Sequence, residues 1–233
     1  YLEADRADQV AGNEKTSKNE LAGKTHVIDA SGRVLRDNVW GPQIEDAARR
    51  DFTINALFYD PATQTVVDYH HGLKDLKKQT LRMIGDPATR YREDPVRLLR
   101  VVRFAAKLGF TIEPATKKPM AETAKLLENI PQSRLFDEMI KLLQTGHALA
   151  SCAELRKQGL KTLFPLLAPL MTEGATEKTK QIQFIESALA DTDKRVAEDR
   201  SVVPSFMLAC LIWHDVRERW QAALAKGVHA VPA

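Results

Sequence analysis

The pattern of polar and apolar positions divides the chain near residue 40. Residues 1–40 are polar and irregular, and the polar run over residues 12–20 is typical of a solvated or disordered loop. Asp29–Arg33, which contains a Ser-Gly pair, indicates a turn. Helical periodicity starts at Ile44–Arg50, where early acidic residues and late arginines match the dipole of a helix.

Short runs of β-branched and aromatic residues follow this helix. They cover Ala56–Tyr59, Thr65–Tyr69 and Thr80–Ile84, and a proline or glycine follows each run within a few residues. Runs of this length and composition predict three strands of a small antiparallel unit.

From residue 86 onward the pattern is helical. Apolar residues over Glu93–Leu108 recur at a broadly helical spacing, and Gly109 stands where a C-cap glycine belongs. Ser133 is the expected N-cap of a helix over Arg134–Leu143. The expected fold class is therefore α+β, mainly α, with a mixed front piece to about residue 85. The other expected helices cover residues 121–128, 148–158, 177–190 and 203–224.

Composition sets limits on the class of protein. A chain of 233 residues with 44% hydrophobic content is long enough for one large or two small domains with a core. The formal net charge of +3 is too small to argue for nucleic-acid binding by itself. No apolar run approaches the length of about 20 residues that a membrane span needs. Cys152 and Cys210 lie far apart among apolar neighbours, so we expect buried thiols in a reducing compartment.

The segment Arg49–Ala56, with the sequence RRDFTINA, concentrates polar chemistry. Its charged and amide side chains alternate with apolar ones that would anchor them at fixed angles. Arg50 suits the phosphates of a nucleoside triphosphate, and Asp51 or Asn55 suits ribose hydroxyls. The alternative is the end of a helix whose arginines complement the dipole, with Asn55 capping the next turn.

A second segment combines an acid and a guanidinium at helical spacing. Asp94 and Arg97 are expected one turn apart on one helix face, with Pro95 in the first turn. Together they present an acceptor beside a fork of donors, which suits the Watson–Crick edge of adenine. Arg100 and Arg103 continue the spacing as a basic stripe suited to phosphates. The alternative is an Asp94–Arg97 ion pair at a solvated helix start.

These segments resemble, in order, the motifs of the bacterial-type tRNA nucleotidyltransferase and poly(A) polymerase family. Arg49–Ala56 resembles the family's second motif, and Asp68–Leu76 its connecting motif, which usually has glycine where His71 stands. Residues 93–97 are similar to its base-reading motif. Arg134–Leu143 is similar to the conserved helix that follows.

The resemblance implies a head–neck–body enzyme. Residues 1–85 would be part of a polymerase-β-like nucleotidyltransferase head, 86–146 a helical neck that recognises the base, and 147–233 a helical body that binds RNA. The run Arg90–Phe110 is most similar to the bacterial poly(A) polymerases of the family. The implied activity is therefore template-independent addition of AMP from ATP to RNA 3′ ends.

The resemblance also implies roles for single residues and cofactors. Asp51 would be an active-site acid, Arg50 would contact phosphate, and Asp94 and Arg97 would read adenine. The RNA 3′-hydroxyl would attack the α-phosphate of ATP with the help of two Mg²⁺ ions. RNA 3′ ends and ATP are the implied partners, and protein partners are not identified. Arg100 and Arg103 would support nucleotide binding.

One part of the family pattern is absent. The family's head begins with a Gly-rich turn and an Asp-x-Asp pair that holds the metals, and neither occurs before Arg49. The Asp-x-Asp at Asp191–Asp193 is expected to lie in a loop that ends a helix. We therefore assign no metal ligand here and expect a fragment of a longer cytoplasmic protein that cannot polymerise alone. Mg²⁺-dependent ATP incorporation into RNA by the 233-residue chain would contradict this expectation.

Alternative functions stay open at this point. The CCA-adding tRNA nucleotidyltransferases share every motif quoted above, and a non-catalytic RNA- or nucleotide-binding module would need no metal site. His214-Asp215 resembles the pair of HD metal phosphohydrolases, but it is expected on a helix surface. Lys77-Lys78 and Lys117-Lys118 are expected at the surface, where either pair suits RNA phosphates.

Overall fold

The structure, a computed structural model, describes residues 27–28, 34–36, 41–171 and 180–227. It forms two units, residues 1–40 and 41–233. In the first unit, β1 (Val27–Ile28) pairs antiparallel with β2 (Val34–Arg36). The prediction of an irregular segment missed this pair, because strands this short leave no periodicity. The predicted loop at 12–20 and turn at 29–33 lie outside the described residues, and the expected domain limits near 85 and 146 stay predictions.

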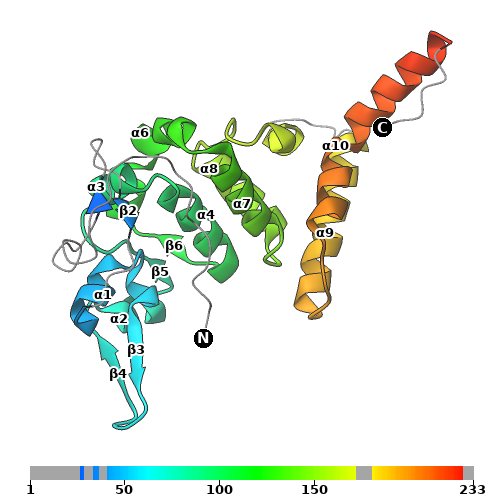
Figure 1. Ribbon diagram of the computed structural model, residues 1–233. Coiled ribbons are helices and arrows are strands. Elements are labelled where there is room, and N and C mark those ends of the chain that lie inside the picture. The colour runs from blue at the N-terminus through cyan, green and yellow to red at the C-terminus, as the bar shows by residue number, and fades with distance from the viewer. Residues whose placement is uncertain (1–26, 29–33, 37–40, 172–179, 228–233) are drawn as a thin grey trace, which may run out of the picture. The chain divides into compact units, whose positions relative to one another are not determined.

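The second unit begins with a helix and a hairpin (Figure 1). The predicted helix and the first two predicted strands are confirmed, because helix α1 is followed by the antiparallel strands β3 and β4. Figure 1 shows β3 and β4 side by side along their length. The elements of this part are α1 (Gln43–Arg49), the 3₁₀ turn η1 (Thr53–Asn55), β3 (Leu57–Asp60), β4 (Thr65–Asp68) and α2 (Gly72–Lys77).

The third predicted strand does not join the antiparallel unit. β5 (Thr80–Leu81) is short and pairs in parallel with β6 (Thr111–Ile112). Beyond β5, Met83 forms a single antiparallel bridge with Phe52. Both pairings bury apolar side chains in the core, which a local pattern cannot foresee because the partners lie about 30 residues away in sequence.

The helix predicted over Glu93–Leu108 is confirmed over Arg97–Leu108, but its predicted start is wrong. α3 (Pro87–Glu93) ends before Asp94, which has an extended backbone, and α4 (Arg97–Leu108) starts after a turn. Pro95 therefore precedes the helix instead of occupying its first turn. The physical reason is that a proline ring disfavours helical geometry for the residue before it. The C-cap predicted at Gly109 is confirmed, with φ at +65°.

The remaining described elements after β6 are helical. α4 contacts both α7 and α8, and α9 contacts α8 and α10. α7 begins one residue after Pro131, so Ser133 lies inside the first turn and the predicted N-cap is wrong. These elements are α5 (Pro114–Lys117), α6 (Met120–Thr123), η2 (Ala124–Asn129), α7 (Gln132–Leu143), α8 (Ala148–Lys157), η3 (Pro165–Met171), α9 (Lys180–Ala197) and α10 (Pro204–Ala225).

The Asp-x-Asp sequence at Asp191–Asp193 lies within α9, so the predicted loop is wrong. Asp193 accepts hydrogen bonds from the backbone N–H groups of Ala148 at 2.7 Å and Leu149 at 3.4 Å. A carboxylate in this place satisfies amide groups that the first turn of α8 leaves without helical partners. Asp193 therefore joins α9 to the start of α8.

The core confirms the mainly helical class and the state of the cysteines. Phe52, Tyr91 and Leu98 are fully buried members of one large apolar cluster. Cys152 and Cys210 are free and buried, as predicted, and burial raises the pKa of the Cys152 thiol to about 12. Among the described residues, none of the helices combines the length and apolar character needed to cross a membrane.

His71 is a candidate for stabilisation, because it adopts the left-handed conformation at φ +60° before α2. Left-handed geometry costs about 1–2 kcal/mol for a residue with a Cβ. Glycine avoids this strain, but it loses more conformational entropy on folding, which costs only about 0.5–1 kcal/mol. We expect His71→Gly to raise the free energy of unfolding by about 0.5–1 kcal/mol in urea denaturation. Lys78→Gly, at φ −87° at the end of the same helix, should lower it. A loss of stability in His71→Gly would contradict the strain argument.

Candidate nucleotide-binding site

The segment 49–56 is fixed at the end of α1 by backbone pairing. The N–H of Ile84 donates to the carbonyl oxygen of Asp51 at 3.0 Å, and the N–H of Thr53 donates to that of Arg82 at 3.0 Å. Phe52 lies between these bonds, fully buried, with its ring 5.4 Å from that of Phe104 in a T-shaped contact. The apolar anchor predicted for this segment is therefore confirmed.

Asp51 uses both carboxylate oxygens inside the protein. Oδ1 accepts from the N–H of Phe52 and from Nδ2 of Asn55, each at 2.9 Å. Oδ2 accepts from Nε of Arg100 at 2.7 Å and from its second nitrogen, Nη2, at 2.6 Å. Asp51 is only 7% exposed, whereas the Arg100 side chain is 41% exposed. Three predicted site residues therefore meet, and Asp51 orients Arg100 through two guanidinium nitrogens that contact one carboxylate oxygen.

Arg50 points to a different acid. Its guanidinium contacts Asp46 at 2.8 Å, and Arg49 reaches the same carboxylate at 3.4 Å. The hydrogen bond from Arg50 holds the pKa of the Asp46 carboxyl below its usual value. The Arg50 side chain is 49% exposed, and exposed pairs of this kind contribute little stability. Arg50 can therefore exchange Asp46 for an anionic ligand at small cost.

The connecting motif, residues 68–76, packs against the 49–56 segment at Thr53. The buried carboxylate of Asp75 accepts from Oγ1 of Thr53 at 2.9 Å and from Nε of Arg82 at 3.0 Å. A Cβ on Gly72 would lie 2.2 Å from the carbonyl oxygen of Thr53, so the two backbones touch. The turn before α2 is closed by Asp68, which accepts from the N–H groups of Gly72 at 2.9 Å and Leu73 at 3.0 Å. In the sequence, this motif was identified only by its resemblance to the family, and its contact with Thr53 was not predicted.

Arg90 joins the two segments that the sequence singled out. Its Nη2 donates to the carbonyl oxygens of Arg49 at 2.8 Å and Arg50 at 2.7 Å. Its Nη1 donates to Glu93 at 3.2 Å, and Nη1 of Arg97 donates to the same carboxylate at 3.2 Å. Arg90 and Glu93 were not among the predicted site residues. Their signal was the Arg-x-x-Glu spacing that runs into the first residue of the base-reading motif.

Asp94 and Arg97 are held by different partners. Oδ2 of Asp94 contacts Nη2 of Arg134 at 3.0 Å, across from α7, while Arg97 is 8% exposed and bound to Glu93. The alternative of an Asp94–Arg97 ion pair is therefore not what the structure contains. Arg134 was missed as a site residue, although it opens the run that resembled the conserved helix. Each member of the predicted adenine-reading pair is oriented separately.

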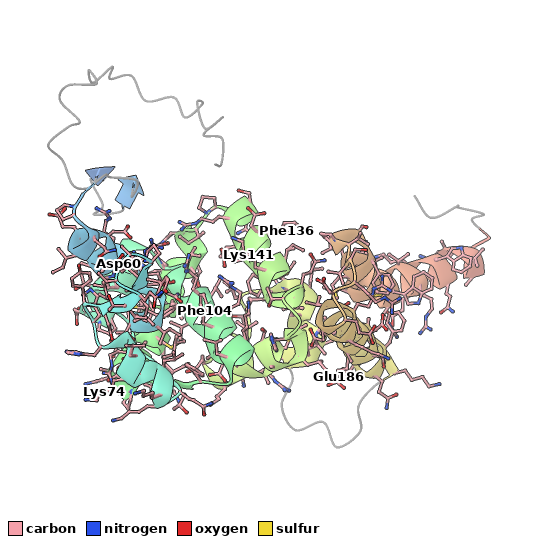
Figure 2. The ribbon with its side chains drawn as sticks, turned by 90° about the horizontal axis from the view of Figure 1, so that it is seen from below. Asp60, Lys74, Phe104, Phe136, Lys141 and Glu186 are labelled. Carbon is pink, nitrogen blue, oxygen red and sulfur yellow. The ribbon has the colours of Figure 1, made fainter. Side chains whose placement is uncertain are left out.

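Arg103 faces α7. Burial lowers the pKa of its guanidinium, and the nearby carboxylates of Glu138 and Asp51 oppose that effect. Glu138 is itself buried and contacts Nζ of Lys141 at 2.8 Å. In Figure 2, Lys141 projects from α7 and Phe104 from the neighbouring helix α4. The predicted basic stripe is thus divided, because Arg97, Arg100 and Arg103 each face a different carboxylate.

The described acids do not fit a metal ion. Among the residues that the structure describes, no group of three or more His, Cys, Asp or Glu side chains could hold one. Asp51 has no free oxygen for a cation, since Arg100 and two N–H donors occupy both. His214 and Asp215 lie together on α10, where His214 contacts the ring of Phe184. The described acids of this site therefore do not supply a set of metal ligands.

Two family models match the chain in order. The first, described as "Poly A polymerase head domain", matches residues 5–82. The second, described as "Probable RNA and SrmB- binding site of polymerase A", matches residues 109–171. The first range includes the 49–56 segment and the connecting motif, which the Thr53–Asp75 hydrogen bond joins, and the second includes all of α7.

Known relatives fall into two groups. Poly(A) polymerase I of Haemophilus influenzae is 47% identical over 89% of this chain and 45% of its own length. The CCA-adding enzyme of Limosilactobacillus fermentum is 43% identical over 60% of this chain and 33% of its own length. A solved tRNA nucleotidyltransferase, complexed with a primer tRNA and an incoming ATP analog, superposes with a TM-score of 0.56. The two sequences are 30% identical, and the superposition includes 82% of this chain and 56% of the solved chain. The chain thus spans less than half the length of these curated relatives.

Proposed function

This chain belongs to the tRNA nucleotidyltransferase and poly(A) polymerase family, and on that premise we propose that it is the nucleotide-selecting part of a poly(A) polymerase. The proposed reaction adds AMP from ATP to RNA 3′ ends without a template. The observation that carries the proposal is the 47% identity to Poly(A) polymerase I over 89% of the chain. Identity to the CCA-adding enzyme extends over only 60%.

The network of contacts supports a role for each residue in the proposed reaction. The RNA 3′-oxygen forms a bond to the α-phosphorus of ATP, the bond from that phosphorus to the oxygen bridging to the β-phosphate breaks, pyrophosphate leaves, and the hydroxyl proton passes to water. Arg50 and Arg100 are partly exposed cations, paired with Asp46 and with Asp51 respectively, so both suit the triphosphate. We assign Asp51 to the orientation of Arg100, because both of its oxygens are engaged.

The proposal assigns the metal ions to other residues. Two Mg²⁺ ions would align the attacking hydroxyl and the leaving pyrophosphate, bound mainly by carboxylates outside the described residues. Within this chain, the proposed contributions are binding, orientation and choice of the base. We assign the reaction to the cytoplasm, since its proposed substrates are RNA and ATP.

Base selection by Asp94 and Arg97 gives the experiment that tests this function. Each hydrogen bond to a buried base edge contributes about 1–3 kcal/mol. We therefore expect Asp94→Ala or Arg97→Ala to reduce the preference for ATP over GTP by roughly 5- to 150-fold. The measurement is the ratio of kcat/KM for the two nucleotides in the gene product that carries this chain.

Arg92→Ala is the matched control for this experiment. Arg92 lies two residues before Asp94, is exposed, and forms no ion pair within the part of the chain that the structure describes. Its removal should leave the ATP to GTP ratio unchanged. Unchanged discrimination in both Asp94→Ala and Arg97→Ala would mean that this pair only supports the fold.

CCA addition to tRNA is the second candidate function. The observation in its favour is the similarity to the solved tRNA nucleotidyltransferase that was complexed with a primer tRNA and an ATP analog. An enzyme of that kind would use CTP as well as ATP. Separate supply of the two nucleotides therefore distinguishes the candidates.

A further inference from the structure

A hollow of about 440 Å³ lies between the α5–α6 segment and the end of α8. This volume falls in the range of sites that hold small ligands or parts of larger ones. Its floor is apolar, formed in part by the buried side chains of Ile112 and Met120. Three exposed lysines line it, Lys117 and Lys118 from α5 and its end, and Lys157 from α8.

The positive charge of this hollow is only weakly balanced. Neither Lys117 nor Lys118 forms an ion pair with any residue that the structure describes, and Lys157 has a long, exposed contact of 3.5 Å to Glu154. Glu154 is also engaged by Nε2 of Gln158 at 2.6 Å. Glu113, which precedes α5, is already bound to Arg82 at 3.1 Å. An anion that entered the hollow would therefore meet cations without displacing a strong partner.

We propose that this lysine-lined hollow binds the phosphate backbone of the single-stranded RNA substrate. The inference rests on the proposed function and deepens it, because an RNA 3′ end must be held by phosphates beyond the reacting nucleotide. Lysines beside an apolar floor suit a chain that alternates phosphates with flat sugars and bases. All lining residues fall within 109–171, the range matched by the family model described as an RNA-binding site. An acidic protein segment is the competing ligand, and the test includes it.

The test compares two triple variants of the 233-residue chain by fluorescence anisotropy with labelled oligoadenylate. One is Lys117→Gln/Lys118→Gln/Lys157→Gln. The matched control is Lys107→Gln/Lys180→Gln/Lys226→Gln, three exposed lysines of α4, α9 and the end of α10 that do not line the hollow. Both variants reduce the formal net charge of +3 to zero. Urea denaturation of each variant checks that the fold is kept.

The expected result is a loss that only the hollow variant shows. Its affinity should fall about tenfold or more, and the slope of log K against log salt should decrease by about 2, because each lost single-strand phosphate contact removes about 0.7. The control should keep the slope. Equal losses in both triples, or an unchanged slope in the hollow variant, would overturn the inference while leaving the proposed function in place.

Three further outcomes separate the remaining explanations. If polyglutamate binds the wild-type chain and oligoadenylate does not, the hollow serves an acidic protein and the inference is overturned. A wild-type chain that binds neither oligoadenylate nor ATP would overturn the proposed function together with the inference. ATP binding without RNA binding would overturn the inference alone.

Discussion

Gly72→Ala should lower the free energy of unfolding by about 3 kcal/mol, the upper part of the usual range for overpacking. The new Cβ would lie 2.2 Å from the carbonyl oxygen of Thr53, a backbone atom that cannot rotate away. Thr53 is also held by its N–H bond to Arg82 and its hydroxyl bond to Asp75. Relief of the clash must therefore break one of these bonds and displace Asp51, which should weaken ATP binding as well.

Gly109→Ala is the matched control for this prediction. Gly109 has φ at +65°, and a Cβ added there would have no atom of the described residues within 4 Å, so only backbone strain applies. That strain costs about 1–2 kcal/mol. Urea denaturation of both variants checks the difference, with nucleotide titration as the second measurement. A Gly72→Ala protein as stable as Gly109→Ala would show that the connecting motif does not press against Thr53.

Asp51 and Arg100 should act as one unit in nucleotide binding. Asp51→Ala leaves the guanidinium of Arg100 without its carboxylate partner, and we expect the kcat/KM for ATP to fall about 10²-fold or more, as for the loss of a group that positions a reacting centre. Asp51→Ala and Arg100→Ala should couple by about 1.5–3 kcal/mol in a double-mutant cycle on stability, the range for charged hydrogen bonds.

Additive effects in that cycle would contradict the positioning role. Asp46→Ala supplies the control, because its contact with Arg50 is exposed and should couple by less than about 1 kcal/mol. If Asp51 acts through Arg100, the double variant Asp51→Ala/Arg100→Ala should lose no more kcat/KM than Asp51→Ala alone. A loss in Asp51→Ala with no loss in Arg100→Ala would indicate that Asp51 has a direct catalytic role, as the resemblance implied.

Part of the site could be predicted from the sequence because its signals are local. The alternation around Phe52 marked a buried anchor, and the family motifs marked both segments of the site. Pro95 carried a local signal that was read incorrectly. It was placed inside a helix, whereas its effect on the preceding residue ends α3 at Glu93.

The rest of the site depends on contacts between residues that are distant in sequence. Arg90 reaches carbonyl oxygens about 40 positions earlier, and Arg134 reaches Asp94 about 40 positions away. The parallel pairing of β5 with β6 is of the same kind. Periodicity reports which face of an element is apolar, and it contains no information on which partner covers that face. The partners of Arg90, Arg134 and β5 are therefore fixed by tertiary packing, which the local pattern does not contain.

The choice between ATP and CTP tests the central claim most directly. The gene product that carries this chain is supplied with tRNA lacking its CCA end and Mg²⁺, and ATP and CTP are added in separate reactions. The account predicts that AMP is added to the 3′ end with ATP and that nothing is added with CTP. Addition of CMP would contradict the assignment as a poly(A) polymerase and would establish CCA addition in its place.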